Sequence, residues 1–279
     1  MSLLLPDAKT PVRPSLTELA TCDRPSTLTS AEEAVNLQSR IFYLRSYLLM
    51  RTIIGVTGIL LPVVVIVGDH SLSADAPTVR GSLSGYYYTG MRDFFVGALS
   101  TIAIFLITYK IFERTLNNVL TVIAGLAAGA VAFFPTKRPG GLDVALTPWQ
   151  AKIGEENVSV VHYSAAAVFI LSLALMSFFF GLQEGRRTRQ RAGRLSALSP
   201  SFWRWFHWFM ALAILLAGAF AYSSWRGNMY PDYYLIVAET VAIVAFGLSW
   251  LAKGLELDVL LGPRSARRRA KREVAVQNP

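Results

Sequence analysis

The sequence predicts an all-α fold, a polytopic membrane helix bundle with six transmembrane helices and both termini in the cytoplasm. Hydrophobic residues make up 53% of the 279 positions and charged residues only 16%, and the mean hydropathy is +0.42. Such a composition is too apolar for a soluble domain. Because a helix needs about 20 mostly apolar residues to cross a bilayer, the chain has room for six spans. They are expected at about residues 52–69, 93–112, 118–135, 158–182, 205–225 and 233–252.

The distribution of basic residues predicts the orientation of these spans. The loop of residues 184–204 has six arginines and one acidic residue, Arg40, Arg45 and Arg51 precede the first span, and the C-terminal tail is also basic. Six spans place all three clusters on one side, which is cytoplasmic because lysine and arginine collect there. We therefore expect a multi-pass protein of the cell inner membrane. The net charge of the chain is +9. We expect the basic clusters to contact anionic lipid headgroups rather than nucleic acid.

The ends of the apolar region predict the domain organisation. Residues 1–30 are polar and proline-containing and are expected to be a disordered cytoplasmic tail without a removable signal peptide. Residues 31–48 are predicted to be a juxtamembrane amphipathic helix, with Ser30 and Glu33 in capping-box spacing. Residues 49–255 form the predicted six-helix transmembrane domain, and residues 256–279 form a basic cytoplasmic tail.

Small residues predict close helix packing in the first and third spans. The first span contains Gly55 and Gly58, and an interior proline, Pro62, is expected to kink it. The third span contains a GxxxG motif formed by Gly125 and Gly129, which is typical of tight packing between membrane helices. The loop that follows, at residues 136–157, is expected to be irregular.

The second span begins in an unusual stretch, SLSGYYYTGMRDFFVG at residues 82–97, which carries two charges into an apolar run. At about 100° per residue, one stripe of this helix is smaller and more polar than the opposite face. We expect that stripe to face the other helices, because small and polar residues mediate packing in membranes. It consists of Asp93, Gly97, Ser100, Thr101 and Ile104.

Four ionisable residues are expected at the outer ends of the helices. His70 ends the first span, Asp93 begins the second, His162 lies about one turn inside the fourth, and Glu239 lies within the first two turns of the sixth. His207 is at the opposite, cytoplasmic end. Ionisable groups within membrane helices are costly and usually face a cavity or a partner. Asp93, His162 and Glu239 are therefore the candidate catalytic residues, as general bases or metal ligands.

Neighbouring polar residues complete the candidate site. The candidate substrate-binding residues are Ser84, Tyr87, Thr89 and Arg92. A divalent metal is one hypothesis for a cofactor, with His70, Asp93, His162 and Glu239 as candidate ligands. The competing interpretation is a structural network in which Arg92 neutralises Asp93 or Glu239, and His162 donates a hydrogen bond that holds helices together.

Several segments resemble a family of bacterial polytopic membrane proteins of unknown function. They are SLSGYYYTGMRDFFVG, AAGAVAFFPT, HYSAAAVFILSLALMS and FGLSWLAKG, which lie between about residues 50 and 255. The chain is also distantly similar to the alkaline ceramidase and adiponectin-receptor superfamily, whose members include zinc-dependent lipid amidases. The similarity implies that Ser84, Asp93 and His162 correspond in type to the serine, aspartate and histidines of the superfamily. The Ser-x-x-x-His and His-x-x-x-His motifs of the superfamily are missing from this sequence.

These observations lead to three functional hypotheses. The first is an integral membrane protein with an outward-facing polar pocket that binds, and in one version hydrolyses, a lipid or small amphiphile. The second is a small transporter. The third is a non-catalytic membrane subunit that docks a partner through its basic cytoplasmic loop and tail. Whether the protein is an enzyme stays open from the sequence. The single cysteine, Cys22, excludes an internal disulfide and a cysteine-based metal site.

Overall fold

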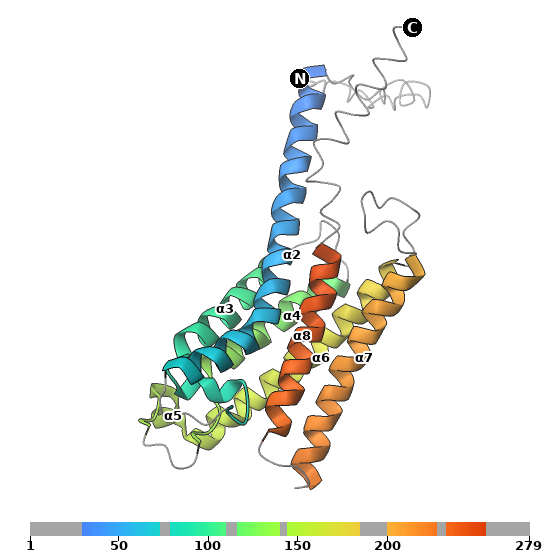
Figure 1. The fold of residues 1–279 in the computed structure, drawn as a ribbon. Helices are drawn as coiled ribbons and strands as arrows, with labels where there is room; N and C mark the ends of the chain where they lie inside the picture. Colours follow the sequence, from blue (N-terminus) through green and yellow to red (C-terminus); the bar gives the residue numbers. More distant parts are fainter. Residues whose placement is uncertain are drawn as a thin grey trace, which may run out of the picture. The chain divides into compact units, whose positions relative to one another are not determined.

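The chain folds as an all-α bundle in a computed structural model that describes residues 30–72, 79–109, 116–139, 144–184, 200–227 and 233–254. These residues form seven α-helices and one 3₁₀-helix (Figure 1). The elements are α2 (Ser30–Leu72), η1 (Ser84–Tyr88), α3 (Arg92–Thr108), α4 (Leu116–Phe133), α5 (Pro148–Ile153), α6 (Glu155–Glu184), α7 (Pro200–Gly227) and α8 (Tyr234–Gly254).

Two compact units divide the chain, Met1–Tyr43 and Leu44–Pro279. In the first unit the described residues form the start of α2. The second unit contains the rest of α2 and all the other elements, and the site described below lies in it. The predicted boundary at residue 48 falls inside α2, which is helical from Ser30 to Leu72. The predicted N-terminal tail lies outside the described residues apart from Ser30, and the predicted C-terminal tail lies outside them entirely.

Four described helices are long and apolar enough to cross a membrane. They are Leu48–Leu72, Glu155–Glu184, Ser201–Ser224 and Tyr234–Lys253. This confirms a multi-pass membrane bundle. The other two predicted spans correspond to α3, which has 17 residues, and to α4, in which Asn118–Phe133 is a shorter apolar helix.

Glycines allow the closest approaches between helices of the bundle. A Cβ atom on Gly55 of α2 would lie 2.9 Å from the backbone nitrogen of Leu251 in α8, and one on Gly125 of α4 would lie 2.7 Å from the carbonyl oxygen of Ala103 in α3. Real Cβ atoms do not approach a backbone this closely, so both positions require glycine. The packing predicted for Gly55 and Gly125 is confirmed, whereas a Cβ on Gly129 would meet Ala103 at an ordinary 3.9 Å.

The predicted orientation of α3 is wrong. Asp93, Gly97 and Ile104 are exposed, and Ile104 has 60% of its surface accessible. The bulky apolar face is buried instead, with Phe95, Ala98, Leu99, Ile102, Ala103 and Leu106. Shape explains the difference. The face of α3 that contains Ala103 packs closely against Gly125 of α4, which buries this face and leaves the stripe with Asp93 outside.

The loop between α4 and α6 is more ordered than predicted. It contains the short helix α5, which begins with a complete capping box between Thr147 and Gln150 and has Pro148 in its first turn. A threonine followed by proline and then by glutamine at the third helical position is a helix start signal. The start of this helix could therefore have been predicted from the sequence TPWQ at 147–150.

Candidate functional site

A short irregular stretch before α3 positions the central serine of the candidate site. Ser82 accepts a hydrogen bond at its Oγ from the Gly85 backbone nitrogen, at 2.9 Å. Thr89 donates from its Oγ1 to the Tyr86 carbonyl at 2.9 Å and accepts from the Met91 nitrogen at 3.1 Å. These local bonds close the 3₁₀ turn η1 and place Ser84 at its first position. Thr89, predicted to bind substrate, thus stabilises the turn.

The structure brings Ser84 and His162 together. Nε2 of His162 lies 2.9 Å from Oγ of Ser84, and Nδ1 of His162 lies 2.6 Å from the carbonyl oxygen of Phe134 at the end of α4. Both side chains are buried, with 2% of His162 and 6% of Ser84 exposed. A carbonyl oxygen can only accept, so Nδ1 carries a proton. In the neutral ring Nε2 is then unprotonated, and the Ser84 hydroxyl donates to it.

Glu239 of α8 is the third member of this group. Its Oε2 accepts a hydrogen bond from the Leu83 backbone nitrogen, next to Ser84 in the chain, at 2.6 Å. A nearby backbone bond from Ile236 to the Gly81 carbonyl, at 3.0 Å, joins α8 to the same stretch. Ser84, His162 and Glu239 therefore form one centre, built from η1, α6 and α8 and completed by the end of α4.

The hydrogen bonds of His162 show what this centre can do chemically. Because Nδ1 donates to the Phe134 carbonyl, Nε2 can take the hydroxyl proton of Ser84. Transfer of that proton is what activation of a serine nucleophile requires. Glu239 holds the backbone next to Ser84 through the Leu83 nitrogen.

Asp93 and His70 lie apart from this centre. The Asp93 side chain is exposed in the first turn of α3, and His70 is exposed in the last turn of α2. Within the described residues, neither side chain forms a hydrogen bond with the centre. In the same residues, no group of three or more His, Cys, Asp or Glu side chains could hold a metal ion.

Arg92 and Tyr87 form a pair of their own. Nη2 of Arg92 donates to the Tyr87 hydroxyl oxygen at 2.8 Å, and its Cζ lies 4.4 Å from the centre of that ring. The guanidinium group is exposed while Tyr87 is buried. Arg80 and Asp69 form an ion pair that was not predicted from the sequence. Nε of Arg80 lies 2.7 Å from the buried carboxylate of Asp69. Each of these arginines therefore has a contact within the bundle.

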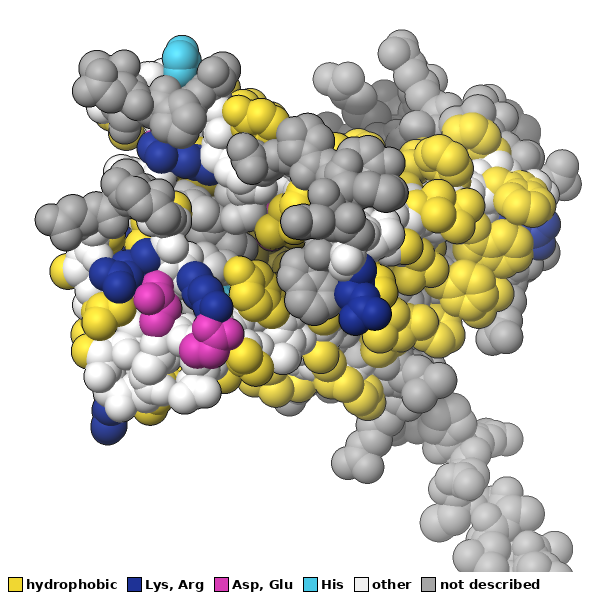
Figure 2. Space-filling model, turned by 90° about the horizontal axis from the view of Figure 1, so that it is seen from below, with side chains coloured by type: hydrophobic (Ala, Val, Ile, Leu, Met, Phe, Trp, Pro, Cys, Tyr) yellow, Lys and Arg dark blue, Asp and Glu magenta, His cyan; other side chains and the backbone are white. Residues whose placement is uncertain are grey.

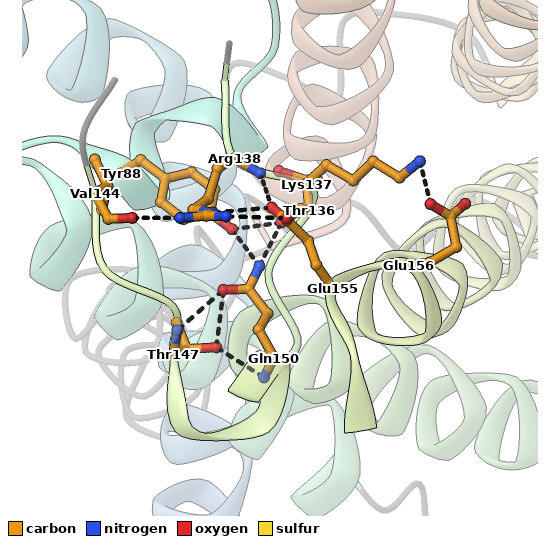
Figure 3. Close-up of polar contacts among 9 residues, drawn as sticks. All are labelled: Tyr88, Thr136, Lys137, Arg138, Val144, Thr147, Gln150, Glu155 and Glu156. Atoms are coloured by element: carbon orange, nitrogen blue, oxygen red, sulfur yellow. Dashed lines mark hydrogen bonds and ion pairs between the residues drawn. The ribbon is translucent and has the colours of Figure 1, made fainter. Parts of the chain in front are cut away.

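A second polar network ties the loop between α4 and α6 to η1 (Figure 3). Gln150 of α5 donates from Nε2 to the Tyr88 hydroxyl oxygen at 2.7 Å and to the Thr136 carbonyl at 3.1 Å, and Tyr88 also donates to that carbonyl. Burial raises the pKa of Tyr88, so the hydroxyl keeps the proton that it donates. Arg138 binds Glu155 at the start of α6, and Figure 2 shows acidic and basic side chains next to one another on this face.

The opposite end of the bundle has a separate buried polar cluster. Nζ of Lys253 pairs with Glu184, and the guanidinium group of Arg51 donates to the Lys253 carbonyl at 3.3 Å. His207 is also buried there, with its Nδ1 2.8 Å from the Oγ of Ser249. As predicted from the sequence, His207 is not part of the centre around Ser84.

No protein-family model, curated protein or solved structure matches this chain.

Proposed function

We propose that the protein is an inner-membrane hydrolase or acyl transferase that acts on a lipid or small amphiphile through Ser84. In this proposal α3 and α4 also cross the membrane, which gives six spans, cytoplasmic termini and an outward-facing centre. The basic loop and tail contact anionic lipid headgroups. The bacterial membrane protein family that the sequence resembles is its proposed family. The observation that carries the proposal is the contact of Nδ1 of His162 with the Phe134 carbonyl, because it leaves Nε2 free to accept the Ser84 proton.

The reaction follows from this arrangement. The Oγ of Ser84 attacks the carbonyl carbon of an ester or amide, and its proton passes to Nε2 of His162. That proton then passes to the leaving alcohol or amine as the bond between the carbonyl carbon and the leaving group breaks. In the second half, water or an acceptor alcohol gives its proton to Nε2 of His162 and attacks the acyl-serine. The bond between the acyl group and Oγ breaks, the acyl group leaves as an acid or ester, and Nε2 returns the proton to Ser84. Glu239 holds the backbone at Leu83 and thereby positions Ser84.

A lipid substrate fits the position of the centre. His162 belongs to α6 and Glu239 to α8, both of which are long enough to span a membrane. Apolar side chains near His162 in α6 are exposed, including Val160 with 55% and Val161 with 39% of their surface accessible. The acyl chains of a lipid substrate would make favourable contacts with this surface.

The test is reaction of membranes that contain the protein with a fluorophosphonate probe, followed by mass spectrometry of the adduct. We expect an adduct on Ser84 that disappears in Ser84→Ala and remains in Ser164→Ala, a control at an exposed serine of α6. Folded protein that forms no adduct at Ser84 with a short-chain and a long-chain probe would overturn the proposal.

A proton-coupled transporter is the second candidate. The observation that favours it is that Glu239 and His162 contact adjacent residues, Leu83 and Ser84, because carboxyl and imidazole groups in membrane helices often relay protons. Proteoliposomes with an internal pH dye distinguish the two candidates. Proton flux that is lost in Glu239→Gln, together with no adduct at Ser84, would favour the transporter over the hydrolase.

A further inference from the structure

Helix α5 presents large apolar side chains at the surface. Leu146, Trp149 and Ile153 have 44%, 47% and 40% of their surface accessible. Trp149 and Ile153 lie four residues apart in α5, Leu146 immediately precedes the N-cap residue Thr147, and the exposed Lys152 lies in the same helix. An exposed tryptophan within an otherwise polar loop needs a partner, since water is a poor environment for so much apolar surface.

The exposed face of α5 is held rigidly in place. Its first turn is closed by the capping box, in which the Thr147 backbone nitrogen donates to Oε1 of Gln150 at 3.0 Å. Gln150 is itself 2% exposed and binds Tyr88 and the Thr136 carbonyl, so the helix is fixed to two other segments (Figure 3). The bundle thus orders a helix whose apolar side chains it does not cover.

The surface of α5 continues that of the adjoining helices. At the end of α4, Phe133 has 59% of its surface accessible, and in the first turns of α6 Val160 and Val161 are exposed as well. The Phe134 and Trp149 rings lie 5.5 Å apart, so α5 directly adjoins the end of α4. Because α6 is a candidate membrane span, its exposed apolar residues face lipid. The same lipid is within reach of α5.

We propose that α5 is an interfacial helix that inserts Leu146, Trp149 and Ile153 into the leaflet at this end of the bundle. The partner is the phospholipid bilayer itself, with the apolar side chains at the boundary between headgroups and acyl chains, and Lys152 at the phosphates. A tryptophan flanked by a lysine is the combination typical of that depth. This goes beyond the proposed enzymatic function and does not depend on it.

The contact would also reach the candidate site. Phe134 packs its ring against Trp149, while its carbonyl oxygen lies 2.6 Å from Nδ1 of His162. Phe134 therefore orients the His162 imidazole and also contacts the inserted Trp149.

Site-directed spin labelling of the full chain in nanodiscs of phosphatidylcholine and phosphatidylglycerol tests the insertion. In a Cys22→Ser background, labels are introduced as Trp149→Cys, Lys137→Cys and Val161→Cys. We expect the label at 149 to resemble the one at 161, with frequent collisions with oxygen and a loss of collisions with a water-soluble nickel complex. The label at 137, on a side chain with 52% of its surface exposed, should show the reverse.

Leu146→Cys provides a second probe in case the loss of Trp149 disturbs α5. Labels at 146 and 149 that are both as accessible to the nickel complex as the label at 137 would overturn the proposal. The readout involves no reaction at Ser84. A failed fluorophosphonate experiment therefore leaves this proposal standing, and a water-exposed α5 leaves the proposed hydrolase standing.

Discussion

The Nε2 atom of His162 lies 2.9 Å from the Oγ atom of Ser84, although 78 positions separate the two residues in the chain. The contact joins η1 to α6, and the Phe134 carbonyl at the end of α4 fixes the ring from its other side. Three segments must therefore be correctly packed for one imidazole nitrogen to face the serine. Four predictions test this centre and the packing that supports it.

Replacing the imidazole should slow the reaction of Ser84 without unfolding the protein. In His162→Gln no side-chain group of suitable basicity can take the serine proton, so the rate of fluorophosphonate labelling should fall by about 100-fold. His70→Gln is the matched control, because that side chain is exposed at the end of α2. An unchanged labelling rate in His162→Gln would show that His162 is not the base.

Glu239 should matter most through its acceptor oxygen. Glu239→Leu removes the partner of the Leu83 backbone nitrogen, and an unsatisfied donor should lower the free energy of unfolding by about 1–3 kcal/mol. Glu239→Gln keeps an acceptor of the same reach and should cost less. Unfolding of both variants in mixed detergent micelles measures the difference. Equal stabilities would mean that the bond from Leu83 contributes nothing.

The GxxxG motif of α4 should tolerate alanine at one position only. Gly125→Ala places a methyl group 2.7 Å from the Ala103 carbonyl oxygen, and we expect a loss of about 1–3 kcal/mol in unfolding free energy from overpacking. Gly129→Ala meets only ordinary contacts at 3.9 Å and should be neutral. The melting temperatures of the two purified variants provide the comparison, and the prediction fails if Gly129→Ala is the more damaging of the two.

The buried pair of Glu184 and Lys253 should be sensitive to the loss of either partner. Lys253 is 0% exposed and Glu184 is 2% exposed, so Lys253→Met leaves a buried carboxylate and should cost about 3–5 kcal/mol. The double variant Glu184→Leu/Lys253→Met should recover part of this loss. Lys152→Met, at an exposed lysine, serves as the control. A double variant less stable than Lys253→Met would contradict this account.

The membrane bundle and the candidate polar residues could be predicted from the sequence. Hydropathy depends only on composition along the chain, so the long spans could be read directly, and the spacing of Gly125 and Gly129 indicated close packing. Topology placed His162 and Glu239 near the starts of their helices. The amino-acid sequence alone was enough to make these two residues and Ser84 candidates, because polar and ionisable groups in apolar helices are rare enough to stand out.

Which of these candidates contact one another depends on how the helices pack. The stripe with Asp93 proved to face outward, because helix periodicity defines two faces but the shape of the neighbouring helix selects the buried one. His162 is oriented by the backbone carbonyl of Phe134. Because every residue has such a carbonyl, the residue type at position 134 does not predict this contact. The partnership of Ser84, His162 and Glu239 depends on how η1, α6 and α8 pack, and packing over such separations is a property of the folded chain.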